Sequence, residues 1–349
     1  MVQEEIFDMT VIGGGPAGLY SAFYSGLREM KTKIIEFQPM LGGKVHVYPE
    51  KMIWDVGGLT PMPAAKLIEQ LVQQGLTFNP EVVLNEKIES ITRSSDGIFE
   101  LHAASGRVHL SKTVIVAVGG GILNPQKLDI EGASRFEVSN LHYTVKSLKQ
   151  FKDKTVIISG GGNAAVDWAN ELEPIAKKVY ITYRREALTG HEATVGQLLN
   201  SSVECLAHTS ISKLHARGDH EVIERVELTH HQTGEVLELK VDEVIINHGY
   251  EQDASLLENS TLQIEIAENF YIAGTANSES SVPGLYAAGD ILKHEGKLHL
   301  IAGAFQDAAN AVNKAKMFIQ PDAEGYAMVS SHNDLFKDRN KELVKKMMV

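Results

Sequence analysis

Two stretches of the chain share one order of hydrophobic and polar positions. In each, a short apolar run leads into a glycine-rich turn, followed by apolar residues at helical spacing and then a second apolar run. The first copy covers residues 6–37 and the second covers residues 155–183. A strand, a glycine turn, a helix and a strand make up a βαβ unit of about 30 residues. The pattern therefore predicts two nucleotide-type folds in one chain.

The segments around these copies predict how the chain is divided. Short β-like runs follow each copy and end in an apolar strand, so we expect a small β insertion in each fold. We assign residues 1–118 to the first part of one domain, residues 119–249 to a second domain, and residues 250–349 to the return of the first. The predicted class is α/β, with two Rossmann-like dinucleotide-binding domains.

The last hundred residues contain one long amphipathic pattern and a polar tail. We expect a helix over residues 299–317 and a tail after residue 321 that is only partly ordered near its end. The predicted buried face of this helix consists of Ala302, Phe305, Ala309, Val312 and Ala315.

Composition narrows the class of protein. The 349 residues include 33 Lys and Arg against 45 Asp and Glu, and the resulting net charge of −12 disfavours non-specific binding to nucleic acid or anionic lipid. Cys205 is the single cysteine, which excludes an internal disulfide, a CxxC pair and a cysteine-ligated zinc site. Neither a signal-peptide core nor an apolar run of about 20 residues is present. We expect a cytoplasmic protein without a metal or a membrane span.

The first glycine turn matches a dinucleotide fingerprint. Gly13, Gly15 and Gly18 have the spacing in which the first glycine allows a tight turn, the second admits a pyrophosphate and the third permits close helix packing. Pro16 and Ala17 lie inside this motif and belong to the predicted site. Glu36 ends the next strand, 18 residues past Gly18, where a carboxylate can accept hydrogen bonds from a ribose diol.

The second glycine turn has the same spacing but a different charge after it. Gly160 and Gly162 are followed by Asn163, Ala164 and then an alanine at the third fingerprint position, which the motif tolerates.

Two arginines, Arg184 and Arg185, take the place of the ribose acid after the second turn. A guanidinium pairs with a 2′-phosphate and finds no comparable partner on a bare ribose, so the second dinucleotide should be NADP(H).

Two dinucleotide sites in one chain imply that one dinucleotide reduces the other, and FAD is the natural recipient of a hydride from NADPH. With these motifs the chain resembles the thioredoxin-reductase-like flavoproteins over essentially its whole length, and among them the ferredoxin-NADP reductases of that type. The resemblance implies hydride transfer between NADP(H) and FAD, followed by one-electron transfer to or from ferredoxin or flavodoxin. It also implies a homodimer.

The same resemblance carries over several further contacts. Residues 284–290 are similar to the family's second FAD motif, in which Asp290 would contact the ribityl chain. Residues 116–119 resemble the crossover strand, with Leu123 beside it, and Ile88 would bond the adenine end through its backbone.

Residues 41–44 and 47–51 resemble the segment that covers the flavin. By that resemblance Gly43 and Lys44 would contact FAD, and Tyr48 would lie against one face of the flavin ring. A partly buried core tyrosine is the alternative for Tyr48.

The C-terminal segment departs from the family pattern. Relatives place a histidine or aromatic ring over the opposite flavin face, with a serine or threonine near the ring. Counting without gaps, that position falls on Val329, with Ser331 just after it and His332 three residues late. Either Val329 covers the ring without stacking, or a small insertion brings His332 into place, and the uninterrupted count favours Val329. A second departure is Thr189, where relatives often have a third arginine.

Two other functions stay open at this point. A disulfide reductase of the same fold would need CxxC in the second domain or a cysteine inside the first glycine motif, where this chain has Ala17. A non-enzymatic NADPH sensor would need neither Asp290 nor the flavin-covering segment, and a colourless purified protein would favour it.

Substitution of the single cysteine distinguishes one-electron transfer from disulfide reduction. We expect Cys205→Ser to leave NADPH-driven reduction of a one-electron acceptor unchanged, because the flavin needs no thiol partner. The steady-state rate of the FAD-loaded variant measures this. A drop in this rate of more than about tenfold, roughly 1.4 kcal/mol on the barrier, would favour the disulfide-reductase function instead.

Overall fold

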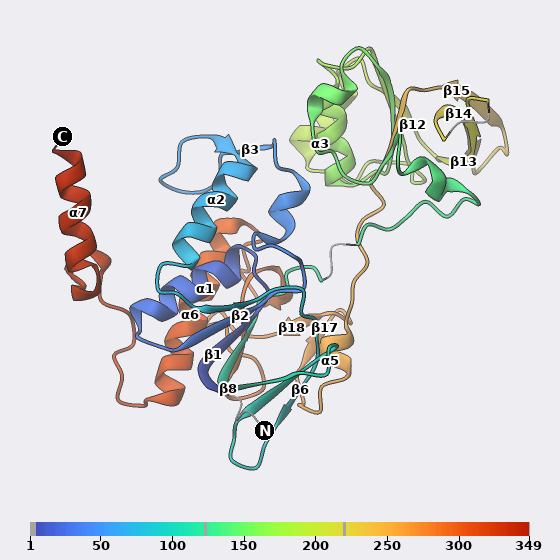
Figure 1. Ribbon diagram of the computed structural model, residues 1–349. Helices are drawn as coiled ribbons and strands as arrows, with labels where there is room; N and C mark the ends of the chain where they lie inside the picture. The colour runs from blue at the N-terminus through green and yellow to red at the C-terminus, as the bar shows by residue number, and fades with distance from the viewer. Residues whose placement is uncertain (1–4, 122–123, 219–220, 349) are drawn as a thin grey trace. The chain divides into compact units, whose positions relative to one another are not determined.

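The computed structural model consists of two compact units (Figure 1). Residues 1–122 and 252–349 make up the first unit, and residues 123–251 make up the second. Each unit is built on its own sheet, mostly parallel in the first unit and fully parallel in the second, so the predicted α/β class with two dinucleotide-type folds is confirmed. The structure describes residues 5–121, 124–218 and 221–348.

The main sheet of the first unit is mostly parallel. Its strands are β1 (Ile6–Ile12), β2 (Thr32–Ile35), β5 (Glu81–Val83), β6 (Ile88–Arg93), β7 (Phe99–Ala103), β8 (Val108–Val116) and β19 (Leu285–Ala287). Their order is β5-β2-β1-β8-β7-β6, with β19 beside β8. β6 and β7 pair antiparallel and form the expected β insertion. β8 connects all parts of the sheet, because it pairs with β1, β7 and β19.

Alternation of side chains along β8 divides the core of this unit into two layers. Val114 and Val116 pack with Phe99 and Leu285 on one face, while Ile115 packs with the helices on the other. Such period-2 alternation of apolar residues to both faces is typical of a strand covered on both sides.

Three helices lie beside the sheet of the first unit. The helices α1 (Pro16–Leu27) and α6 (Ile301–Ile319) pack against the sheet, and α2 (Ala64–Gly75) packs against α1. The smaller elements of the unit are η1 (Gly43–Val47), β3 (Met52–Ile53), β4 (Met62–Pro63), α5 (Ser255–Glu258), β17 (Ile266–Ala267), β18 (Tyr271–Ala273), η4 (Gly289–Ile291) and β20 (Leu292–Lys293).

The buried face of α6 differs from the one predicted. Ala302, Phe305 and Ala309 are only partly buried, although Val312 and Ala315 lie in the core as expected. The helix is rotated so that a stripe of small residues faces the sheet and an acid is buried with them. The buried residues are Ala304, Asp307, Ala308, Ala311, Val312 and Ala315. Small side chains allow the helix backbone to approach the sheet closely, and a hydrophobicity pattern does not register that preference.

The second unit has a five-stranded parallel sheet and a separate antiparallel one. The parallel strands are β9 (Leu141–His142), β10 (Thr155–Ser159), β11 (Lys178–Thr182), β12 (Glu204–Leu206) and β16 (Glu243–Ile246), in the order β12-β11-β10-β16-β9. The helical elements are α3 (Asn163–Leu172), α4 (Glu192–Leu199), η2 (Ala133–Phe136) and η3 (Leu148–Phe151).

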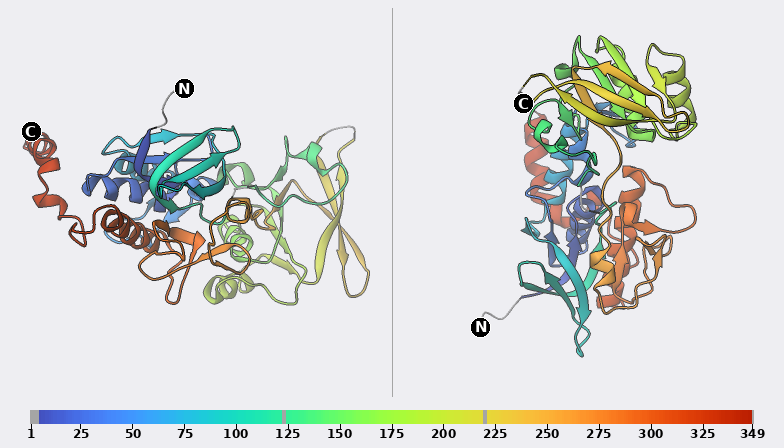
Figure 2. Two further views of the ribbon diagram at one scale, coloured as in Figure 1. Left: turned by 90° about the horizontal axis from the view of Figure 1, so that it is seen from below. Right: turned by 90° about the vertical axis from the view of Figure 1, so that its right-hand side faces the viewer.

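The β insertion of the second unit has three strands, whereas the sequence pattern predicts only two, over residues 222–228 and 236–239. β13 (Thr209–Ala216), β14 (Ile223–His230) and β15 (Val236–Lys240) form an antiparallel sheet, seen as the yellow strands in Figure 2. β13 was not predicted because its serine, lysine and histidine residues interrupt the apolar alternation.

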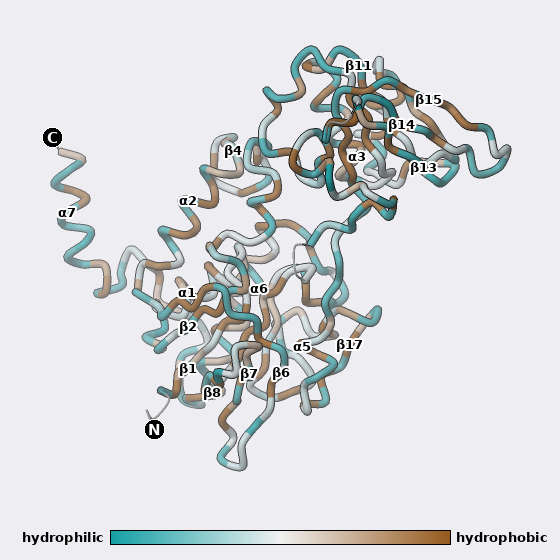
Figure 3. The backbone as a smooth tube through the Cα atoms, turned by 45° about the vertical axis from the view of Figure 1, so that its right-hand side comes forward, coloured by the Kyte–Doolittle hydropathy of each residue, from teal (hydrophilic) through white to brown (hydrophobic). Residues whose placement is uncertain are grey.

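The C-terminal tail, which we expected to be only partly ordered, contains regular structure. It consists of η5 (Ser330–His332), η6 (Asp334–Phe336) and α7 (Lys337–Met347). α7 exposes Leu343, Val344 and Met347 among charged residues, and its trace alternates between hydrophobic and hydrophilic colours in Figure 3. Within the described residues, no helix is both long and apolar enough to cross a membrane.

Candidate functional site

The first glycine turn lies at the carboxyl edge of the main sheet in the first unit, directly after β1. The Gly13 N–H donates to Ile35 O at 2.8 Å, which continues the pairing with β2. Gly13 has φ +110°, and a Cβ there would lie 2.4 Å from Ala117 O. This position therefore accepts glycine alone.

The other two glycines of the motif have different tasks. A Cβ on Gly18 would lie 1.9 Å from Gly13 O, so the third glycine is needed for the helix to pack against the turn. A Cβ on Gly15 would meet only Gly43 Cα, at 3.8 Å, so this position is open. Gly15 is the N-cap of α1, and no side chain caps the helix. Open space at an uncapped helix N-terminus fits a pyrophosphate.

Glu36 lies directly behind this turn and is only 7% exposed. Its Oε2 accepts a hydrogen bond from the Gly14 N–H at 2.6 Å, and Oε1 accepts one from the Gln38 N–H at 2.7 Å. Each carboxylate oxygen has two lone pairs, so both can still accept from ribose hydroxyls. The carboxylate is thus held next to the glycine turn and keeps capacity to accept further hydrogen bonds.

The predicted flavin-covering segment contacts the glycine turn. The Gly42 N–H donates to Gly14 O at 2.8 Å, and a Cβ on Gly43 would lie 2.8 Å from Gly15 Cα. Lys44 is exposed, whereas Tyr48 is half-buried and packs against the cluster around Val45 and Ile68. The structure therefore brings Gly43 to the glycine turn and leaves the Lys44 side chain exposed, and it places Tyr48 partly in the core.

The second predicted FAD motif ends at the same edge of the sheet. The Ala288 N–H donates to Val116 O at 3.0 Å, and Gly289 follows with φ +77°. A Cβ on Gly289 would lie 3.0 Å from the Cβ of Ala17, so the two motifs are in contact. The Asp290 side chain is 48% exposed, with His299 Nδ1 at 3.8 Å from its Oδ1.

The remaining predicted FAD contacts have different surroundings. Ile88 is buried in the core at the start of β6, which leaves only its backbone for a ligand. Val329 is 62% exposed, and Ser331 and His332 are also exposed. Leu123 lies outside the described residues.

The second unit repeats the glycine turn at the carboxyl edge of its own sheet. The Gly160 N–H donates to Thr182 O at 2.9 Å, and a Cβ on Gly160 would lie 2.4 Å from Asn247 O. A Cβ on Gly162 would enter open space, with no atom within 4 Å, and this residue is the uncapped N-terminus of α3. Ala164 follows in the first turn of this helix, and Asn163 Oδ1 accepts from the His191 N–H at 2.8 Å.

Arg184 and Arg185 follow β11 and are both exposed. Neither guanidinium has an ion-pair partner within the part of the chain that the structure describes. Thr189 holds their loop in place, because its N–H donates to Gly161 O at 2.8 Å and its Oγ1 donates to the same oxygen at 3.2 Å. Thr189, which stands where relatives often have a third arginine, therefore anchors this loop to the glycine turn.

His248 is a residue of this edge that the motifs did not indicate. It follows β16, and its Nε2 forms a hydrogen bond of 2.9 Å with Ser159 Oγ, just before the glycine turn. Burial lowers the pKa of His248, and the positive charge of Arg184 lowers it further. A neutral imidazole thus lies beside the arginine loop. Its position after a parallel strand is the signal that could have identified it.

Cys205 lies on β12 of the second unit and is half-buried. Burial raises the pKa of its thiol. A protonated thiol is a poor nucleophile, so the chemistry of this residue matches a packing role.

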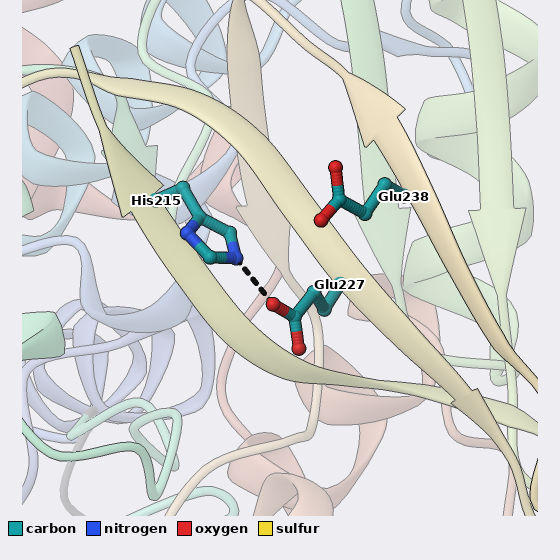
Figure 4. Close-up of side chains that lie close together, drawn as sticks. All are labelled: His215, Glu227 and Glu238. Carbon is teal, nitrogen blue, oxygen red and sulfur yellow. Dashed lines mark hydrogen bonds and ion pairs between the residues drawn. The ribbon is translucent and has the colours of Figure 1, made fainter.

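Three titratable side chains come together in the antiparallel sheet of the second unit, namely His215, Glu227 and Glu238 (Figure 4). His215 Nε2 lies 2.5 Å from Glu227 Oε1, and Arg225 Nη1 lies 2.7 Å from Glu238 Oε2. Lys213 Nζ is 3.8 Å from Glu227 Oε1. Because each carboxylate already faces a cation, the group is accounted for as ion pairs across neighbouring strands.

Comparison with known proteins agrees with this geometry. The family model of the pyridine nucleotide-disulphide oxidoreductases matches residues 7–315. Ferredoxin–NADP reductase 1 of Bacillus licheniformis is 77% identical over 349 residues, with all of both chains covered. The protein of the same name from Bacillus cereus is 78% identical over 348 residues, again with all of both chains covered. Ferredoxin–NADP reductase 2 of Exiguobacterium sibiricum is 70% identical, with 100% of this chain and 99% of its own covered.

Solved structures share the fold at lower identity. Thioredoxin reductase of Lactococcus lactis, in its FR conformation, has a TM-score of 0.75 at 23% identity and covers 90% of this chain and 99% of its own. The bacillithiol disulfide reductase of Staphylococcus aureus has a TM-score of 0.69 at 18% identity, with 90% and 99% covered. These likenesses establish the fold.

Gly15 and Gly18 of the first turn provide a test of the pyrophosphate site, in which one variant is the control for the other. Gly15→Ala should leave stability nearly unchanged and weaken binding of FAD, because the added Cβ enters open space beside the uncapped helix. Gly18→Ala should destabilise the first unit by more than about 2 kcal/mol, because a backbone oxygen occupies the space of its Cβ. Thermal unfolding of the apoprotein and FAD titration measure the two effects. Equal FAD affinity in Gly15→Ala and the wild type would contradict the pyrophosphate assignment.

Proposed function

Because the chain belongs to the pyridine nucleotide-disulphide oxidoreductase family, and within it to the ferredoxin–NADP reductases, we propose that it transfers electrons between NADP(H) and ferredoxin or flavodoxin. It is an oxidoreductase that uses FAD and NADP(H). The observation that carries the proposal is a difference between two similar glycine turns. One has the buried acid Glu36 behind it, and the other has the exposed bases Arg184 and Arg185.

In this proposal residues 1–118 with 250–349 are the FAD domain, and they contain most of the first unit. Gly15 admits the pyrophosphate to the N-terminus of α1, and Glu36 accepts from the adenosine ribose. Asp290 accepts from the ribityl chain. The other residues proposed to contact FAD are Gly13, Pro16, Ala17, Gly18, Gly43, Lys44, Tyr48, Ile88, Leu123 and Ser331.

Residues 119–249 form the NADP(H) domain in this proposal. Gly160, Gly162, Asn163 and Ala164 receive the pyrophosphate at the N-terminus of α3, and the two arginines bind the 2′-phosphate. The exposed guanidiniums support this, since an unpaired arginine keeps its full set of donors for a phosphate.

Bound FAD supplies the chemistry, because it accepts a hydride as an electron pair and releases electrons singly. The side chains of this chain bind and orient the two dinucleotides, and the proposal assigns none of them a proton in the hydride step. Tyr48 on one side of the ring and Val329 on the other are proposed to exclude water from it, with His332 as the alternative to Val329.

The proposed protein partner is a small acidic electron carrier of the ferredoxin or flavodoxin class. We further propose a homodimer, which the exposed apolar side chains of Leu343, Val344 and Met347 on α7 support. The single cysteine supports a cytoplasmic location, since a chain with one cysteine forms no internal disulfide and does not depend on an oxidising compartment.

Parallel assays with three acceptors test the electron-transfer function. NADPH should drive reduction of ferredoxin and flavodoxin by the FAD-loaded protein, and thioredoxin should not be reduced, because the half-buried Cys205 has no second thiol. Stopped-flow absorbance of the flavin and of each acceptor measures the rates. Turnover with thioredoxin but not with the other two proteins would refute the proposal.

Neutralising the arginine loop tests the coenzyme assignment. We expect Arg184→Gln with Arg185→Gln to raise KM for NADPH by more than about tenfold and to change KM for NADH little, because each charge-assisted contact to the 2′-phosphate contributes roughly 1.5 to 3 kcal/mol. Arg217→Gln, at another exposed arginine of the second unit, is the matched control. An equal loss with both coenzymes would exclude the 2′-phosphate contact.

A further inference from the structure

Asp307 is a buried charge in an otherwise apolar helix face. It is 5% exposed, and its neighbours on the buried face of α6 include Ala304, Ala308 and Ala311. Removing a carboxylate from water costs several kcal/mol unless ion pairs and hydrogen bonds compensate. Asp307 adds no apolar contact to the buried face of α6, so the contacts of its carboxylate must account for its burial.

The partners of the Asp307 carboxylate come from the segment that carries Asp290. The Gly289 N–H donates to Asp307 Oδ2 at 3.0 Å. Lys297 Nζ forms an ion pair with the same oxygen, and the Lys297 side chain is only 4% exposed. The carboxylate therefore holds the segment just before Asp290 and again seven residues after it.

The first of these contacts reaches the first glycine turn. Gly289 has φ +77°, and a Cβ at this position would lie 3.0 Å from the Cβ of Ala17. The hydrogen bond from Gly289 to Asp307 thus fixes the backbone at the place where the two proposed FAD segments touch. Ser278 Oγ also donates to the Asp307 carbonyl at 2.8 Å, which ties α6 to the loop before β19.

The Asp290 side chain is held far less firmly than that of Asp307. It is half exposed, and His299 Nδ1, itself on an exposed side chain, lies 3.8 Å from its Oδ1. Its direction is consequently set by its backbone, which Asp307 and Lys297 hold on both sides.

We propose that Asp307 and Lys297 are positioning residues for flavin binding, which orient Asp290 toward the ribityl chain through the backbone of Gly289. This inference rests on the proposed FAD site. Asp307 acts through a backbone amide and an ammonium, so it needs no contact with the flavin.

A double-mutant cycle between Asp307 and Asp290 tests the proposal. The apoprotein is titrated with FAD, and flavin fluorescence gives Kd for the wild type, Asp307→Asn, Asp290→Asn and the double variant. We expect Asp307→Asn to raise Kd about tenfold, because the amide keeps an acceptor for Gly289 but loses the ion pair. The double variant should lose little more than Asp290→Asn alone, since a misdirected Asp290 is already lost.

Two further variants separate positioning from general stability. Lys297→Met should raise Kd for FAD by a similar factor. If Asp307→Asn does not fold, this variant alone tests the positioning role. Lys314→Met is the control, because Lys314 lies on the same helix and pairs with Glu279 at 3.3 Å, away from Asp290 in sequence. It should leave Kd within about twofold of the wild type. Thermal unfolding of each apoprotein is recorded alongside.

The outcomes distinguish this inference from the function on which it rests. Unchanged Kd in Asp307→Asn and Lys297→Met, or additive losses in the cycle, would overturn the positioning role even if unfolding temperatures fall. A wild-type apoprotein that does not bind FAD would instead overturn the proposed function.

Discussion

The absence of a side chain at Gly18 is the constraint on which the first unit depends. A Cβ there would lie 1.9 Å from Gly13 O, so α1 can begin directly behind β1 only with glycine at this position. That close approach brings the uncapped N-terminus of α1 to the carboxyl edge of the sheet. Gly43, Glu36 and Gly289 then meet the same turn from three other segments.

Buried carboxylates give this edge its chemistry. Glu36 is oriented by two backbone amides and keeps lone pairs for a ligand. Asp307 is oriented by the amide of Gly289 and by Lys297, whereas Asp290, the residue after Gly289, has a half-exposed side chain. In both cases backbone amides, and for Asp307 also an ammonium group, compensate the burial of the charge and fix the direction of the carboxylate.

The second unit uses the same turn with the opposite charge. Gly160 fits against Asn247 O much as Gly13 fits against Ala117 O, so both turns are held by the strand beside them. The arginines beyond β11 remain exposed, and Thr189 anchors their loop by two hydrogen bonds to Gly161. An uncapped helix N-terminus with exposed guanidiniums nearby is the arrangement from which we propose an anion site here, as we propose a ribose site from the acid of the first unit.

The sequence alone determined the two βαβ units, the α/β class, the glycine turns and the charges behind them. These features follow from local patterns, since a strand, a tight turn and a helix are encoded within about 30 residues. The tertiary structure decided which face of α6 is buried, that β13 joins its sheet, that Thr189 is an anchor and that His248 lies beside Arg184. It also decided that Asp307 is buried with Lys297. The physical reason is that these contacts join residues from separate elements, so packing rather than local spacing brings them together.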